Sequence, residues 1–549
     1  MKWLNRVFVL FGVLGLMLSS CEDMLEADYN GVIAEEDYHL NSPNDSIYSM
    51  LGIVKALEAL GERYVVLGEV RGELLELTPN ASEDIRQISN FEPAPDNRYA
   101  DVRDYYAVIN RCNLFVERLD TSIVAQGQKV MQKEFAAAKA IRAWTYLQLL
   151  LNHGEAHYYE NALVSVLDAE EVESKSRMNL EEVLPLLIAD LETVRDIPLP
   201  GSLELGEDVV DSRKLLLPVR FVLGDLYLYN GDYEKAAQAY YDLMYNDFLL
   251  LTDEYRLQLE VVDLAFTDYF SSSWNQAFRP INNETELVSF IAGSVAYGSS
   301  NGLDSLFRLD YELKPSEVAL DYWDTQTYYH SQALSRQGDL RRYGSFSVNT
   351  FYLGSLANSE TRWVNRKYTQ TENTWAVPIY RVGLLYLRYA EAVNRAGKPN
   401  LAFAVLKNGV SAAELNNNSI IPEQEKIPLA PYMDFTRDRF NVFSATSEIN
   451  TRGVHSRGSG NVHNIVSYVI ASEPDWTLQD SILYVEDLIV TELALETAFE
   501  GNRFHDLMRV AKRRNDPAYL ASKVASRAGA ESLRLQGLLM DEKNWYLPY

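Results

Sequence analysis

Basic side chains are scarce in this sequence. Lysine and arginine number 50 against 78 aspartate and glutamate residues, which gives a formal net charge of −28. Proteins that bind nucleic acid rely on basic surface to neutralise phosphates, so this class of function is disfavoured, and so are strongly anionic ligands. The simplest role for the acidic excess is to keep the protein soluble.

Long hydrophobic runs are also missing, apart from one near the start of the chain. The stretch from Val7 to Leu18 is almost entirely apolar and follows the basic residues Lys2 and Arg6. It holds about 12 residues, whereas a membrane-spanning helix needs roughly 20. A basic start followed by a short apolar run predicts a secretory signal peptide over residues 1–20.

Cysteine occurs only at positions 21 and 112. The segment Leu18-Ser19-Ser20-Cys21 resembles the lipobox of bacterial lipoproteins, in which the cysteine carries a diacylglycerol. Two acyl chains suffice for stable membrane anchoring, so we expect Cys21 to be the lipidated first residue of the mature chain. An ordinary signal peptide with a chance cysteine is the alternative. Lipidation leaves Cys112 without a partner for a disulfide, and residues 21–41 are expected to form a tether.

Apolar residues recur every three or four positions in several stretches, which predicts helices. These stretches cover residues 46–61, 105–119, 131–151 and 485–513. Between the first two, residues 78–103 are rich in Asn, Asp, Pro and Ser and predict a long loop. Long loops in compact domains often carry function.

Two segments share one spacing of small residues. Gly224, Gly231, Ala236 and Tyr240 recur as Ala390, Gly397, Ala402 and Leu406, with offsets of 7, 5 and 4 in both sets. Small residues let two antiparallel helices approach closely, and the glycine between them turns the chain. The spacing resembles the tetratricopeptide (TPR) pattern and predicts helix pairs near residues 215–245 and 384–410. We expect Gly224 and Ala236 to meet at a helix contact.

The segment between the two pairs, about residues 250–380, is rich in Tyr, Trp, Ser, Asn and Gly. It contains the turn signal Ser299-Ser300-Asn301-Gly302 and predicts a loop-rich region. Exposed aromatic faces with a polar rim suit sugars. The candidate ligand-binding residues are Trp274, Trp323 and Trp363 from this segment, with Arg71, Asn97, Arg98 and Tyr99 from in and near the first loop.

Among these candidates, Trp274 is the preferred stacking platform, because serines and an asparagine flank it. For every aromatic candidate the alternative is a place in the core. Trp144 and Trp545 lie in predicted scaffold segments and are expected to be core residues.

The segment Glu492 to Arg509, ELALETAFEGNRFHDLMR, resembles the C-terminal signature of the SusD/RagB family of nutrient-uptake lipoproteins of Bacteroidetes. Residues 386–392, 141–146, 109–113 and 545–548 are similar to further segments of that family and occur in the family's order. The resemblance covers essentially the whole mature chain, with residues 42–549 as one domain.

This resemblance implies a mainly α fold, in which TPR-like helix pairs form a scaffold and long irregular loops carry the ligand face. It also implies a lipid-anchored protein of the outer membrane, facing the cell exterior. Such a protein binds an oligosaccharide, or alternatively a peptide, and delivers it to a SusC-like TonB-dependent transporter. The acids and arginines of the signature are expected to pair along one helix and to be structural.

Catalysis has little support in the sequence. His153 and His157 have an i, i+4 spacing, but Gly154 interrupts the helix and no third metal ligand is obvious. Neither a G-x-S-x-G elbow nor a P-loop lysine motif occurs. Carboxylate pairs of glycosidases are defined by separation in space, so the sequence leaves a secreted hydrolase open as an alternative. A TPR scaffold for protein partners is another. No cofactor or metal is expected.

Overall fold

The computed structural model describes most of the chain from residue 40 onward. The described residues are 40–125, 127–201, 204–205, 210–252, 260–262, 265–267, 274, 277–278, 286–294, 298–331, 334–355, 358–368, 374–441, 452–459, 465–471, 473 and 475–549. The predicted signal peptide, Cys21 and the tether up to residue 39 lie outside this part. Leu40 is already buried and forms a β-bridge with Leu119, so the folded domain includes the last predicted tether residues.

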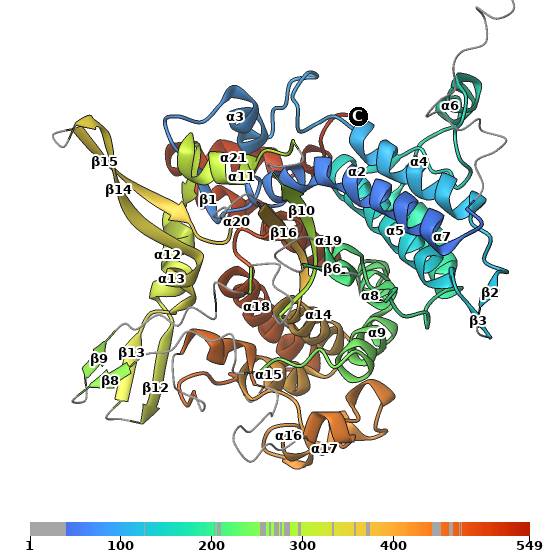
Figure 1. The fold of residues 1–549 in the computed structure, drawn as a ribbon. Helices are drawn as coiled ribbons and strands as arrows, with labels where there is room; N and C mark the ends of the chain where they lie inside the picture. Colours follow the sequence, from blue (N-terminus) through green and yellow to red (C-terminus); the bar gives the residue numbers. More distant parts are fainter. Residues whose placement is uncertain are drawn as a thin grey trace, which may run out of the picture.

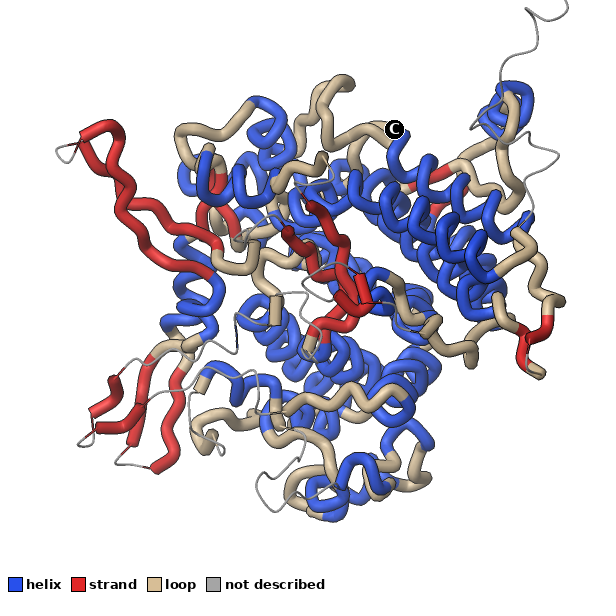
Figure 2. Tube along the Cα trace, in the orientation of Figure 1, coloured by secondary structure: helices blue, strands red, loops and turns tan. Residues whose placement is uncertain are grey.

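Helices dominate the fold (Figures 1 and 2). The N-terminal group comprises α2 (Pro43–Glu69), α4 (Arg103–Arg118), α5 (Gln132–His153) and α7 (Leu180–Glu192). The C-terminal group comprises α18 (Leu478–Glu496), α19 (Arg503–Arg514), α20 (Pro517–Ala525) and α21 (Ser532–Leu539). The predicted helices over 46–61, 105–119 and 131–151 are confirmed, and α2 is longer than predicted at both ends.

Local signals explain where these helices begin. Ser42 caps α2 by accepting the backbone N–H of Asp45 at 3.3 Å, and Pro43 occupies the first turn, where its missing N–H costs nothing. The predicted loop over 78–103 contains the short helix α3 (Glu83–Asn90), so it is only partly irregular.

Both predicted helix pairs are confirmed. The first is α8 (Val219–Asn230) with α9 (Tyr233–Asn246), and the second is α14 (Val382–Arg395) with α15 (Pro399–Lys407). Gly231 and Gly397 turn the chain between them with φ of 83° and 84°, a region that favours glycine. The ring of Tyr240 lies against Gly224, because a Cβ at Gly224 would lie 2.4 Å from its Cε1, and the contact of Gly224 with Ala236 stays a prediction. The glycine makes room for that ring.

The C-terminal signature does not form one helix, which corrects the prediction for residues 485–513. Helix α18 ends at Glu496 and α19 begins at Arg503, while Phe499 and Gly501 between them have φ of 68° and 90°. This turn points four backbone N–H groups, from residues 499 and 501–503, at the carboxylate of Glu69 at 2.8–3.4 Å. The signature therefore docks onto the end of α2.

The signature acids form ion pairs with other segments instead of along one helix. Glu496 contacts Arg341, Arg381 and Arg457 at 2.7–2.8 Å, and Glu500 contacts Arg381 at 2.7 Å and Lys367 at 2.5 Å. Glu286, Asp339, Glu492 and His455 complete this buried charge network, whose side chains are all nearly inaccessible to solvent. Within α19, only the pair of Arg509 with Asp506 follows the helix spacing, at 2.9 Å. The prediction of a structural role is thus supported by a different set of contacts.

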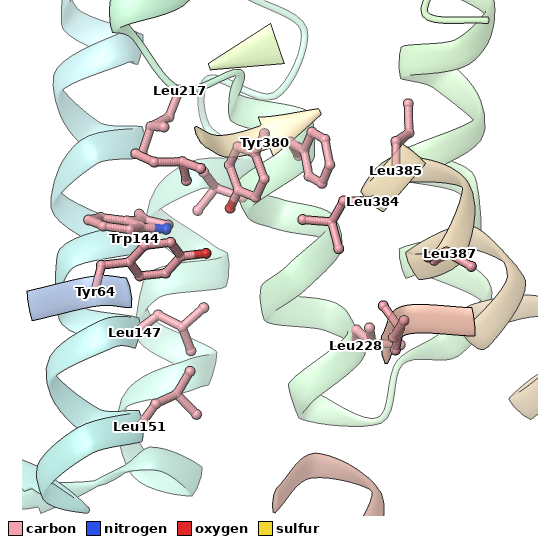
Figure 3. Close-up of a cluster of buried hydrophobic side chains, with 14 of the residues drawn as sticks. Tyr64, Trp144, Leu147, Leu151, Leu217, Leu228, Tyr380, Leu384, Leu385 and Leu387 are labelled. Atoms are coloured by element: carbon pink, nitrogen blue, oxygen red, sulfur yellow. The ribbon is translucent and has the colours of Figure 1, made fainter. Parts of the chain in front are cut away.

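One large hydrophobic core joins the two helical groups. Trp144 from α5 packs on Tyr64 from α2 with ring centroids 5.6 Å apart, and leucines of α5, α8 and α14 surround them (Figure 3). Trp144 and Trp545 are buried, as predicted, and so is Cys112 on the inner face of α4.

Two-stranded sheets and short helices occur in the described parts of residues 250–380, where a loop-rich region was predicted. β10 (Leu287–Ser294) pairs with β16 (Thr374–Arg381) beside α2, while β12 (Thr327–Ser331) pairs with β13 (Leu334–Gln337). The hairpin of β14 (Phe346–Ser355) and β15 (Asn358–Asn365) projects from the helical body (Figure 2). Among the residues that the structure describes, no helix combines the length and apolarity needed to cross a bilayer.

Candidate functional site

Trp274, the preferred stacking platform, is fully buried. Its ring meets Phe278 edge-on with centroids 5.8 Å apart, and the guanidinium groups of Arg381 and Arg457 lie 5.7 and 6.0 Å from its centre. The expectation of an exposed face is therefore wrong, because Phe278, Arg381 and Arg457 surround the ring. Trp274 packs against the buried charge network.

Trp323 and Arg71 are also core residues, which corrects their assignment to the ligand face. Trp323 lies in α12 (Glu317–Asp324), is fully buried, and donates from Nε1 to the carbonyl of Leu495 at 3.3 Å. Arg71 donates from Nη1 to the carbonyl of Trp545 at 3.0 Å, and its burial lowers its pKa to about 9. A side chain without accessible surface cannot stack on or bind a ligand in this conformation.

The stretch 97–99 divides into two buried residues and one exposed one. Asn97 is buried and donates from Nδ2 to the carbonyl of Asp84 at 3.0 Å, so its role is to hold the loop. Tyr99 is buried, and its hydroxyl donates to Oε1 of Glu62 at 2.7 Å. Arg98 is 55% exposed and lies 3.2 Å from Glu62 and 3.7 Å from Asp84. Only Arg98 among the three remains a candidate for ligand contact.

Trp363 is half-buried at the base of the projecting hairpin. Its ring lies 5.2 Å from that of Phe346 and 5.9 Å from the guanidinium of Arg342. The partly exposed ring leaves Trp363 open as a contact residue, although it is not in the cleft described next.

A cleft of about 380 Å³ lies between α2, residues 298–303 and the start of β16. This volume falls within the range typical of small-ligand sites. Its lining residues are Lys55, Glu58, Ala59, Glu62, Gly298, Ser299, Ser300, Gly302, Leu303 and Trp375. The predicted turn Ser299-Ser300-Asn301-Gly302 forms one wall, with Asn301 capping the short helix α11 (Gly302–Asp304).

Trp375 supplies the aromatic surface of this cleft. It stands opposite Gly293 in the antiparallel pair of β10 and β16. A Cβ at Gly293 would lie 2.0 Å from Cζ2 of Trp375, so the ring lies flat over a strand position that has no side chain. The glycine thus holds the indole ring at the edge of the cleft, where it is half-buried.

Each charged side chain of the cleft lining already has an ionic partner. Nζ of Lys55 lies 2.5 Å from Oε2 of Glu58 and 3.4 Å from Oγ of Ser299. Glu62 accepts from Tyr99 and pairs with Arg98. Burial raises the pKa of Tyr99 far above its usual range, so its hydroxyl keeps the proton that it donates. An aromatic surface beside paired charges and serine hydroxyls suits a neutral ligand rich in hydroxyl groups.

Sequence reasoning missed Lys55, Glu58, Glu62 and Trp375. The first three follow the three- and four-residue spacing of a helix face, beside the apolar stripe that predicted α2. Such a polar face is usually just solvated, and nothing in the sequence places Trp375 next to it. The turn at 299–302 was the one usable signal for this site.

The histidine pair lies at the end of α5, where Gly154 stops the helix with φ of 79°. Nδ1 of His153 lies 2.9 Å from the carbonyl oxygen of Pro548, and burial lowers the pKa of His153 to about 4. Across the described ranges, no three or more His, Cys, Asp or Glu side chains converge as metal ligands would. His153 instead ties the C-terminal tail to the scaffold.

Comparison with known proteins identifies chains with a similar fold. No family model matches the chain. SusD-like protein P38 of Formosa agariphila is 22% identical over 544 residues, covering 93% of this chain and 92% of that protein. A SusD superfamily structure from Bacteroides thetaiotaomicron matches with a TM-score of 0.56 at 14% identity, covering 93% and 95% of the two chains.

A structure described as a SusD-like carbohydrate binding protein, from Bacteroides vulgatus, matches with a TM-score of 0.54 at 15% identity over 86% of this chain and 84% of its own. The chain therefore has the mainly helical SusD fold, and it is similar to SusD-like proteins along nearly its whole length.

Proposed function

We propose that this protein is a nutrient-binding lipoprotein of the outer membrane that binds a neutral oligosaccharide in the cleft beside Trp375. In this proposal the protein is anchored through Cys21, faces the cell exterior, and passes its ligand to a SusC-like TonB-dependent transporter. It binds its ligand without transforming it.

The cleft carries this proposal. Sugar rings present flat C–H faces that pack on aromatic rings, and they present hydroxyl groups that need hydrogen-bonding partners. Trp375 offers the ring, while Ser299, Ser300 and the paired carboxylates of Glu58 and Glu62 offer the partners. The similar structure from Bacteroides vulgatus that is described as a carbohydrate binding protein supports the same ligand class.

A peptide ligand is the alternative within the same architecture. Extended peptides gain affinity mainly through backbone hydrogen bonds to an open strand or groove. The cleft places side chains from α2 around its opening instead, which favours a sugar.

Calorimetry with neutral oligosaccharides of different linkage, and with peptides of similar size, tests the ligand class. Trp375→Ala should weaken the best ligand at least about tenfold, or 1.4 kcal/mol. Trp476→Ala is the matched control, because Trp476 is another half-buried tryptophan that packs on Tyr484, outside the cleft lining. Equal affinity of both variants and the unaltered protein would refute the cleft as the site.

Membrane fractionation tests the anchor. Cys21→Ala should release the protein or leave it as unprocessed precursor, whereas Cys112→Ala should remain membrane-bound. If Cys21→Ala were still cleaved, acylated and membrane-bound, the lipoprotein assignment would be wrong. Co-purification of the tagged, lipidated protein with a TonB-dependent transporter tests the partner.

A further inference from the structure

A second cavity, of about 300 Å³, is lined by residues of α5, α7, α8 and α19. It shares no lining residue with the cleft beside Trp375. Its volume is at the lower end of the range for small-ligand pockets, so it fits one small molecule and not a helix or a strand of a partner.

The walls of this cavity are mostly apolar. Leucine side chains come from α5, α7 and α8, Met508 comes from α19, and the rings of Tyr229, Tyr233 and Tyr546 complete the lining. A cavity of this composition favours a ligand with an alkyl or aryl body, because burying such a body removes apolar surface from water.

The charged residues of the lining are unequal in sign. Arg509, Lys512 and Arg513 come from one side of α19, against a single acid, Glu181. Glu391 lies behind the arginines and pairs with both of them, with Nη2 of Arg509 at 2.7 Å. Asp506 lies 2.9 Å from Arg509 and Glu486 lies 3.5 Å from Arg513, so the charge of the two arginines is largely neutralised. Lys512 is therefore the cation that can receive an anionic ligand group.

Lys512 interacts with the Tyr546 side chain and is loosely paired with Glu181. Its Nζ lies 3.6 Å from Oε1 of Glu181, a side chain that is 69% exposed, and 5.6 Å from the centre of the Tyr546 ring. Exposed ion pairs contribute little free energy, so the Glu181 side chain can move into solvent when another carboxylate arrives.

From this arrangement we propose that the α5–α7–α8–α19 cavity binds a small monocarboxylate with an apolar body, with its carboxylate at Lys512 and its body among the leucines. This site is independent of the sugar cleft. It gives the protein a second ligand class, an organic acid bound on the helical scaffold.

Calorimetry with decanoate and its neutral analogue decanamide tests this proposal on the full folded domain. Decanoate should bind one molecule per chain, at least about tenfold more tightly than decanamide. Lys512→Gln should abolish that difference. The matched control is Lys175→Gln, which should keep the difference, because Lys175 is an exposed lysine just after the end of α6 (Val166–Glu173).

Two further measurements locate the site. Trp375→Ala should leave decanoate affinity unchanged, and Lys512→Gln should leave oligosaccharide affinity unchanged, which separates this proposal from that of the sugar cleft. Equal affinity for the acid and the amide, no binding of either at millimolar concentration, or unaltered decanoate binding by Lys512→Gln would overturn it.

Discussion

Arg457 and Arg98 each lie between two carboxylates, yet they belong to different kinds of site. Arg457 contacts Glu286 at 2.6 Å and Glu496 at 2.8 Å with almost no exposed surface. Arg98 lies 3.2 Å from Glu62 and 3.7 Å from Asp84 with more than half of its side chain exposed. The same chemistry serves as a structural junction in the buried network and as a solvated rim at the cleft.

The two clusters differ in whether they could still bind a ligand. In the buried network every charged side chain has its partners inside the protein, and no solvent reaches it. At the cleft, the paired charges are accessible, lie beside a half-buried tryptophan and border open volume. Burial and accessible volume, more than residue type, separate a folding site from a binding site in this protein.

The strongest test of this comparison removes the buried arginine. Arg457→Gln leaves Glu286 and Glu496 buried with fewer cationic partners. Breaking a buried ion pair by removing one partner typically costs about 3–5 kcal/mol of unfolding free energy. Urea denaturation should show a loss of that size, and a loss below about 1 kcal/mol would mean that the network is not a structural junction.

Acid should also lower the stability of the protein through a second buried group, His153, which lies outside the charge network. Burial lowers the pKa of His153 to about 4 in the folded chain, against roughly 6.5 when unfolded. Between these values the unfolded chain binds a proton that the folded chain does not, so stability falls as pH falls. The loss is about 1.4 kcal/mol per pH unit, or about 2 kcal/mol from pH 6.5 to 5.

Denaturation curves at pH 7, 6 and 5 check this expectation. His505 adds to the loss, because burial, with Arg71, Arg509 and Arg388 nearby, also lowers its pKa. His153→Gln keeps a polar side chain near Pro548 but cannot titrate, so its stability should fall less steeply with acid. Parallel slopes for the variant and the unaltered protein would contradict the assignment.

Much of the fold was predictable because its signals are local. Helices α2, α4 and α5 follow from apolar periodicity, and the two helix pairs follow from glycine at the turns with small residues at the contacts. The contact of Gly224 with the Tyr240 ring was not predicted, because the spacing indicates that a helix approaches but not which side chain fills the gap.

The candidate site was harder to predict because it depends on contacts between distant segments. Trp274 and residues 454–458 look like loop residues from their Ser- and Gly-rich surroundings, yet they pack around the buried charge network. Trp375 has unremarkable neighbours in sequence and reaches the cleft only because β16 pairs with β10 beside α2. Composition predicts exposure poorly where a buried ion-pair network draws polar segments inward.

A smaller effect is expected within the helical scaffold itself. Gly224→Ala puts a methyl group 2.4 Å from the ring of Tyr240, and such overpacking typically costs about 1–3 kcal/mol. Gly537→Ala is the matched control, because Gly537 lies in α21 with no atom within 4 Å of its added Cβ. Alanine there should stabilise the helix slightly. Thermal melts of the two variants should therefore shift in opposite directions.

The smallest expected change in stability is at the cleft, and it completes the comparison with Arg457. Arg98→Gln removes a guanidinium that also lies between two carboxylates, but solvent screens this pair and rehydrates Glu62 and Asp84 when it is lost. Exposed ion pairs contribute about 0–1 kcal/mol, so urea denaturation should show a loss in that range. Because Arg98 orients Glu62 at the cleft wall, the same variant should weaken oligosaccharide binding more than it weakens the fold. A stability loss as large as that of Arg457→Gln would instead make Arg98 part of the structural framework. The rim of the cleft would then have to be assigned to Lys55 and Ser299 alone.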